Sequence, residues 1–246
     1  MVLTGDQLVR FGEGFVMEEG EYEQSRERRK QDAERLRKIV ERDLQVNTRQ
    51  FSGHFSWCPT KFSKMFSETL IVEVCAVDGV FRNTSLPSGS YTICALRPTP
   101  LGVRAIELTT ENGEVNKLLA ANWLVLPNQS PVLLAEFVLT FFGDDVRINH
   151  KVLADVDDLW AMKNHRHRYV IDEEAVTKVE SLIGRTELHE CEQAITLRCL
   201  TLLGWMHEKQ DLGIETITIE RDGSVTRAER VQLCSRTFLE TPDLWY

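Results

Sequence analysis

A run of interleaved acids and bases near the start of the chain constrains its fold more than any other feature. Between Glu18 and Asp43 the sequence contains no proline and only one early glycine. Glu34 precedes Lys38 by four residues, which is the favoured order for an ion pair on a helix surface. The first half of the run offers almost no apolar side chain to bury. It therefore predicts a long helical arm whose charged start, Glu18–Lys30, is exposed to solvent.

The second half of this arm carries an apolar stripe. Ala33, Leu36, Val40 and Leu44 recur at steps of three and four residues, which places them on one face of a helix. The sequence leaves two candidates for the surface that covers this face. We expect the stripe to pack either on the body of the protein or on a protein partner.

The chain after the arm predicts an α+β fold with a central antiparallel sheet, packed helices and a C-terminal β-hairpin. Branched or alternating apolar runs are typical of strands, and they occur at Thr69–Val77, Ser90–Arg97 and Val103–Thr110. Turn and breaker residues separate these runs, so the strands should pair as an antiparallel meander. Two further strand patterns, joined at Asp222-Gly223, predict the C-terminal hairpin.

Helix signals lie between the meander and the hairpin. Ser130 is a favoured N-cap residue and Pro131 a favoured first helical residue, so they predict the start of an apolar helix that runs to Phe142. The segment Asp145–Ala154 fits an edge strand. Further helices are predicted at Asp155–Lys163, Asp172–Gly184 and Glu187–Lys209. The last of them would place its apolar residues on one buried face.

The bulk properties are those of a globular protein with a sizeable core. The chain has 246 residues, of which 42% are hydrophobic and 27% charged. We expect residues 1–47 to form a lead and the charged arm. Residues 48–246 are expected to form one α+β domain, with a candidate sub-boundary near residues 163–171.

Charge and hydropathy exclude several locations and partners. No apolar run reaches the roughly 18 residues that a membrane span needs, and the first residues lack the basic and apolar regions of a secretory signal. The formal net charge of −9 repels phosphate backbones. We therefore expect a cytoplasmic protein that does not enter a membrane and whose overall charge disfavours nucleic acid.

The six cysteines form no CxxC pair and are expected to be free thiols. Cys58 is a catalytic candidate because His54 precedes it by four residues, and a histidine that lowers the pKa of a thiol can make it a nucleophile. The sequence offers no third group to orient such a pair. That absence favours a structural thiol.

Acids and histidines gather between Asp144 and His167, a composition that is typical of metal sites. It makes a metal-dependent hydrolase or nuclease one alternative function. Its candidate catalytic residues are Asp144, His150 and Asp155, and its candidate metal ligands are His165 and His167. The two candidate ligands would point to opposite faces of a strand, and the acids at 155–158 suit a helix start. We therefore expect neither a metal nor another cofactor.

Basic residues flank these histidines, in the segment Lys163–Arg168. Arginine beside an aromatic residue can grip phosphate or stack on bases, which suggests a nucleic-acid-associated accessory protein as a second alternative. The basic residues that would serve it are Arg26, Arg28, Arg29, Lys30, Arg166 and Arg168. A solvated loop is the simpler interpretation of the segment, because charge clusters usually face water.

Motifs of several common enzyme classes are missing from the sequence. It contains no GxGxxG, GxxxxGKS/T, GxSxG or HExxH, which argues against dinucleotide-binding enzymes, P-loop NTPases, many serine hydrolases and zincins. The leading hypothesis is a non-enzymatic interaction or regulatory protein that docks on a protein partner through its N-terminal arm. Its candidate binding residues are Tyr22, Arg26, Arg29, Leu36, Val40, Arg166 and Arg168.

Overall fold

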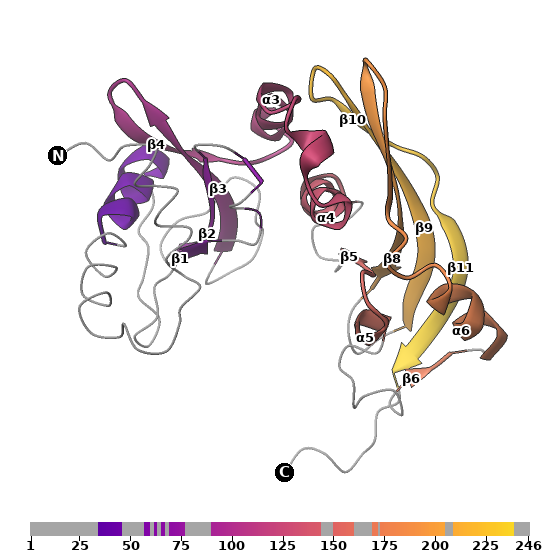
Figure 1. The fold of residues 1–246 in the computed structure, drawn as a ribbon. Helices are drawn as coiled ribbons and strands as arrows, with labels where there is room; N and C mark the ends of the chain where they lie inside the picture. Colours follow the sequence, from indigo (N-terminus) through magenta and orange to yellow (C-terminus); the bar gives the residue numbers. More distant parts are fainter. Residues whose placement is uncertain are drawn as a thin grey trace, which may run out of the picture. The chain divides into compact units, whose positions relative to one another are not determined.

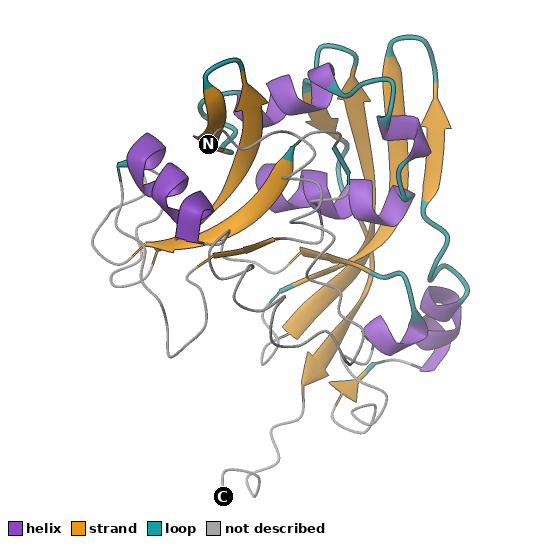
Figure 2. Ribbon diagram, turned by 60° about the vertical axis from the view of Figure 1, so that its left-hand side comes forward, coloured by secondary structure: helices purple, strands orange, loops and turns teal. Residues whose placement is uncertain are grey.

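Helices and antiparallel sheets make up the structure, a computed structural model, so the α+β class is confirmed (Figures 1 and 2). The structure describes residues 34–45, 57–59, 62, 65–66, 69–76, 90–143, 150–159, 169–171, 173–204 and 209–238. The chain divides into two compact units, Met1–Val115 and Asn116–Tyr246. Their boundary falls inside helix α3 (Glu114–Ala121), where no linker composition marks it in the sequence.

The first unit contains a 4-stranded antiparallel sheet with the order β1-β2-β3-β4. Its strands are β1 (Trp57–Pro59), β2 (Leu70–Ala76), β3 (Ser90–Thr99) and β4 (Gly102–Glu107). The last three are the predicted meander. Their register places Val72 opposite Cys94 and Leu96 opposite Ala105, so apolar side chains meet on one face of the sheet.

A helix over residues 34–44 covers that face. Leu36 and Val40 are buried there, and Ile39 and Leu44 pack at the margin. The strand residues of this core are Leu70, Val72, Val74, Cys94, Leu96, Val103 and Ala105. The apolar stripe of the arm therefore packs on the body of the protein, which is the first of the two alternatives. The earlier part of the arm lies outside the described residues.

The second unit contains a 7-stranded sheet, so the meander and the C-terminal hairpin belong to different sheets. Its strands are β5 (His150–Val152), β6 (Tyr169–Val170), β7 (Glu187–Glu190), β8 (Ala194–Leu203), β9 (Lys209–Glu220), β10 (Val225–Arg227) and β11 (Val231–Phe238). The order is β5-β8-β9-β11-β6, with β10 beside β9 and β7 beside β8. β9 and β10 are antiparallel and flank the predicted turn at Asp222-Gly223.

The helix predicted at Glu187–Lys209 is wrong, because the segment forms β7 and β8. Its apolar residues fit both the period of a helix and the two-residue period of a strand. Ile195, Leu197 and Cys199 also alternate at every second position, and each is buried in the strand. Pairing with β9 runs from Ala194 to Leu203. This long ladder, with its branched residues, outweighs local helical periodicity.

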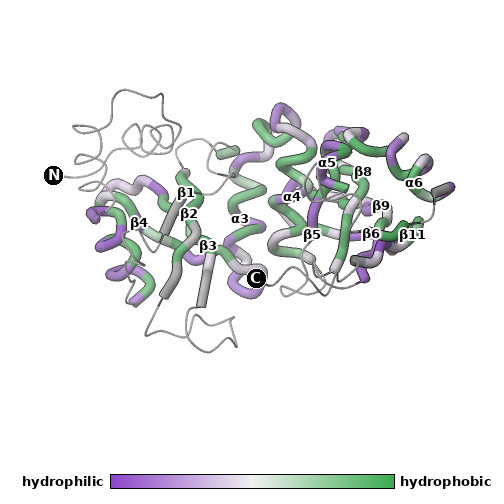
Figure 3. Tube along the Cα trace, turned by 90° about the horizontal axis from the view of Figure 1, so that it is seen from below, coloured by the Kyte–Doolittle hydropathy of each residue, from purple (hydrophilic) through white to green (hydrophobic). Residues whose placement is uncertain are grey.

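The helices after α3 are short, apart from α4. They are the 3₁₀ helix η2 (Leu126–Asn128), α4 (Pro131–Phe142), α5 (Val156–Leu159) and α6 (Glu173–Glu180). The predicted cap of α4 is present, since the Ser130 hydroxyl accepts from the Leu133 N–H at 3.5 Å. Along most of α4 the colouring is apolar (Figure 3). None of the helices in the described ranges is long and apolar enough to cross a membrane.

α4 and α6 lie on opposite faces of the 7-stranded sheet (Figure 1). Val176 and Val179 of α6 pack with Leu200 and Leu212 in one core cluster. Cys199 and Glu215 are directly opposite each other in β8 and β9. Because neighbouring side chains on a strand alternate between faces, this pair lies on the other face, where α4 packs.

Candidate functional site

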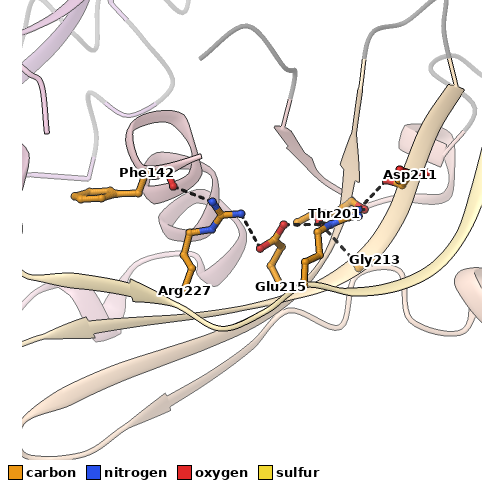
Figure 4. A network of polar contacts seen from close by, with 7 residues as sticks. Phe142, Thr201, Asp211, Gly213, Glu215 and Arg227 are labelled. Atoms are coloured by element: carbon orange, nitrogen blue, oxygen red, sulfur yellow. Dashed lines mark hydrogen bonds and ion pairs between the residues drawn. The ribbon is translucent and has the colours of Figure 1, made fainter. Parts of the chain in front are cut away.

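In the second unit a fully buried carboxylate lies between two arginines (Figure 4). Glu215 lies on β9 with a fully buried side chain. Its Oε2 is 3.0 Å from Nη2 of Arg227, and its Oε1 is 3.2 Å from Nε of Arg230. We call these three residues the Glu215 cluster.

Strand alternation and the hairpin turn bring the cluster together. Glu215 shares a strand face with Ile217 and Ile219, both buried. The hairpin register sets Arg227 opposite Ile217, which makes it a diagonal neighbour of Glu215. Arg230 follows β10 and lies across Gly213, where an added Cβ would be 2.7 Å from the Arg230 Cζ. Glycine at 213 is what lets this guanidinium lie flat on the strand.

The remaining guanidinium N–H groups of Arg227 and Arg230 form hydrogen bonds to backbone carbonyls of other elements. Arg227 Nη1 donates to the carbonyl of Phe142, the last residue of α4, at 2.9 Å. That carbonyl is one of those that a helix leaves without an internal donor, and it lies at the negative end of the helix dipole. Arg230 Nη2 donates to the carbonyls of Thr201 and Asp211, at 3.1 and 2.7 Å. The cluster therefore connects α4, β8, β9 and the hairpin.

The contacts of the Glu215 cluster indicate a structural role and not a catalytic one. The carboxylate of Glu215 is fully buried between two guanidinium groups, so it is not placed to react with a ligand in solvent. The neighbouring thiol of Cys199 is also unreactive, because burial, with a further contribution from Glu215, raises its pKa to about 12. Buried ion pairs of this kind hold elements in place.

A second carboxylate in the first unit also lies between two arginines. Asp43, near the end of the 34–44 helix, accepts from Arg42 at 2.7 and 2.9 Å and lies 3.4 Å from Arg104 Nε. It also accepts the backbone N–H of Ala105 at 2.9 Å, while Arg42 donates to the carbonyl of Val103 at 3.2 Å. The helix end thereby occupies backbone groups along β4, an edge strand that would otherwise be open to pairing.

The described part of the acidic stretch is a helix start. Asp158 Oδ2 accepts the backbone N–H groups of Ala154 and Asp155, at 3.1 and 3.0 Å. Asp155 Oδ1 accepts from the N–H of Asp157 at 2.8 Å. Burial raises the pKa of Asp158, but hydrogen bonds and the charge of Lys151 outweigh it and leave that pKa below its ordinary value. Asp155 and Asp158 therefore have structural roles at α5.

The other sequence-predicted residues are placed only in part. The backbone of His150 lies in β5 opposite Leu203, and that of Cys58 lies in β1 opposite Glu73. Leu36 and Val40 lie in the core of the first unit. Outside the described residues are Tyr22, Arg26, Arg29, Asp144, His165, Arg166, His167 and Arg168. Within the described ranges no group of three or more His, Cys, Asp or Glu could hold a metal ion.

Four cysteines in the described chain are free thiols: Cys94, Cys191, Cys199 and Cys234. Burial and the nearby charge of Glu107 raise the pKa of Cys94. A buried thiol of high pKa behaves as a small apolar side chain.

The Glu215 cluster was missed by the sequence-based interpretation, although two signals for it exist. Glu215 stands at an alternating position with Ile217 and Ile219, so it interrupts an apolar strand face. The turn at Asp222-Gly223 then fixes the register that places Arg227 beside that face. Arg230 has no such signal, because it lies after β10 and outside the paired register.

Comparisons of the chain with protein-family models, curated proteins and solved structures give no match.

Proposed function

We propose that this is a non-enzymatic, cytoplasmic interaction or regulatory protein that docks on a protein partner through its N-terminal charged arm. The supporting observation is the anchoring of the 34–44 helix on the first sheet. Its apolar stripe lies in the core, and Arg42 and Asp43 bond the backbone of β4. The charged sequence from Glu18 continues directly into this anchored helix. Anchoring one end of a docking segment lowers the entropy that it loses on binding.

The outward face of the anchored helix has the chemistry of a specific docking surface. Arg37 Nε donates to Glu34 at 2.8 Å, and Arg37 Nη1 donates to Glu41 at 3.2 Å. Arg35 and Lys38 beside them are exposed. The same interleaving of acids and bases continues upstream to Glu18. Charge patterns of this kind select partners and orient them, whereas they contribute less to affinity.

The organised chemistry of the described chain also favours docking over catalysis. Glu215 is fully buried and engaged by two arginines, and Asp155 and Asp158 cap a helix. Catalytic groups need contact with a substrate and a pKa suited to proton transfer. These carboxylates serve the fold instead.

Site-specific photo-crosslinking tests the proposal. A photo-reactive amino acid replaces Tyr22 in the arm of the full-length chain, and in a matched protein it replaces Thr226, an exposed residue of β10. We expect a discrete crosslinked partner only from position 22, and we expect a peptide of residues 18–33 to compete with it. Arg26→Glu with Arg29→Glu should abolish the crosslink, while Arg26→Lys with Arg29→Lys should keep most of it.

Two results would contradict the docking proposal. One is the same set of crosslinked proteins from positions 22 and 226. The other is partner binding that persists after residues 18–33 are deleted. In that second case the binding surface lies elsewhere on the protein.

A further inference from the structure

Arg236 is a buried cation in the second unit whose environment differs from that of the Glu215 cluster. It lies on β11 opposite Gln210 of β9, and only 2% of its surface is exposed. Its Nε donates to Gln210 Oε1 at 2.8 Å, and its guanidinium carbon lies 4.3 Å from the centre of the Tyr169 ring. The side chain therefore has one hydrogen-bonded partner and one aromatic face.

One terminal nitrogen of this guanidinium lacks an acceptor. Nη1 of Arg236 is buried and has no hydrogen-bond partner in the described chain. No ion pair to a carboxylate of the described residues accompanies it, whereas Arg227 and Arg230 share Glu215. Arginine stays charged in proteins, and a buried charge without a counter-ion costs several kcal/mol. A group that supplies negative charge at Nη1 would offset that cost.

The site is oriented in advance by its neighbours. Gln210 is itself buried, and its Nε2 donates to the carbonyl of Gly204 at 3.1 Å. This bond turns the amide so that Oε1 faces Arg236 Nε. The Tyr169 ring, itself in the core, then fixes the plane of the guanidinium from one side. Support of this kind is what holds a binding group in one geometry.

We propose that Arg236 binds a carboxylate group at its Nη end. A single planar guanidinium matches one carboxylate through two parallel N–H bonds. Phosphate carries a larger charge and is generally held by several donors, while the described donor here is one arginine. The carboxylate comes either from an acid of this chain or from a bound peptide or protein, and both sources present the same chemistry. The inference is independent of the N-terminal arm.

The experiment observes the Nε–Hε resonance of Arg236 in the ¹⁵N-labelled full-length protein, identified by its loss in Arg236→Lys. Sodium acetate is the probe, and sodium chloride at the same ionic strength is the control. The resonances of Arg227 and Arg230 serve as internal controls, because their guanidinium groups already face Glu215. A second protein carries Glu208→Gln, Glu240→Gln and Asp243→Asn, which removes the acids next to the ends of β9 and β11.

The two proteins distinguish the sources of the carboxylate. A saturable shift with acetate in the unaltered chain means that the site takes an external carboxylate. A shift that occurs only in the triple variant means that one of the three acids already fills the site. Either outcome supports the proposal. If acetate moves the Arg236 resonance in neither protein, or moves it no more than chloride does, the proposal is wrong and Arg236 is a structural cation.

Discussion

Two carboxylates of this protein each lie between two arginines, but in very different surroundings. Glu215 in the second unit has 0% exposed side chain, and its partners Arg227 and Arg230 have 13% and 14%. Asp43 in the first unit has 5% exposed side chain, and its partners Arg42 and Arg104 have 59% and 57%. The number of charges is the same. What differs is whether the guanidinium groups keep their water.

This difference decides which partner each group depends on. In the Glu215 cluster all three charges have left water, so loss of the carboxylate leaves two buried cations that face each other. Around Asp43 the arginines stay hydrated if the carboxylate is lost. The main cost is then the loss of the hydrogen-bond acceptor for the backbone N–H of Ala105. Equal numbers of ion pairs therefore do not mean equal stabilisation.

The largest effect is expected for Glu215→Gln. It should lower the free energy of unfolding of the second unit by about 3–5 kcal/mol, the range for breaking a buried ion pair from one side. Native-state hydrogen exchange at the β9 amides measures this unit separately from the first. Glu220→Gln on the same strand is the matched control and should change it by less than about 0.5 kcal/mol. Equal effects of the two substitutions would remove the distinction drawn for Glu215.

Gly213→Ala should have the next largest effect. The added Cβ would lie 2.7 Å from Arg230 Cζ and 2.8 Å from the carbonyl oxygen of Val231, and the second of these is backbone. Overpacking of this kind costs about 1–3 kcal/mol, measurable from the same β9 amides. The double variant Gly213→Ala with Arg230→Ala should recover only part of the loss, because the clash with Val231 remains. Full tolerance of alanine at 213 would mean that Arg230 does not need to lie across the strand.

Asp43→Ala should cost about 1–3 kcal/mol, the cost of leaving a buried N–H without an acceptor. The amide of Ala105 reports it directly, since its exchange should become faster while the β9 amides keep their rates. Unchanged exchange at Ala105 would show that Asp43 does not hold the edge of β4.

The same residue predicts a dependence on pH. Burial raises the pKa of Asp43, but bonds from Arg42 and Ala105 and the arginine charges outweigh it, so the net pKa is below its ordinary value. The stabilisation is then complete above the ordinary carboxylate pKa of about 4 and is lost as the pH falls through the lowered value. Unfolding titrations of the wild type and Asp43→Asn should diverge above that range and converge at lower pH. A constant difference at all pH values would contradict this.

The smallest effect is expected for Arg104→Gln, at about 0–1 kcal/mol, because more than half of this side chain is exposed. Added salt should shrink the effect further through screening. A cost as large as that of Glu215→Gln would show that exposure is not what separates the two clusters.

The elements best predicted from the sequence are those whose signals are local. Ser130 and Pro131 mark the start of α4, and Asp222-Gly223 marks the turn of the hairpin. The error at Glu187–Lys209 has a different origin, since its apolar residues fit helix and strand alike. Pairing of β8 with β9, the next strand along the chain, and with β7 inside the segment decided the outcome. Such pairing favours the strand where the apolar pattern of the segment fits both structures.

The candidate site was predictable to a smaller extent. Glu215 interrupts an alternating apolar face and Arg227 follows from the hairpin register, so two members of the cluster had signals. Arg230 reaches Glu215 through a loop and across a glycine, which only the three-dimensional structure shows. Arg236 is similar, because its position beside Tyr169 depends on the pairing of β11 with β6.

The most direct test of the comparison is a pair of double-mutant cycles, Glu215→Gln with Arg227→Gln and Asp43→Asn with Arg104→Gln. Each cycle isolates the coupling free energy of one carboxylate–arginine pair. We expect about 2–3 kcal/mol for Glu215 and Arg227, near the upper end of couplings between contacting residues. For Asp43 and Arg104 we expect less than about 1 kcal/mol, as for exposed pairs. Equal coupling in the two cycles would contradict the conclusion that desolvation, and not the number of arginines, sets the strength of these contacts.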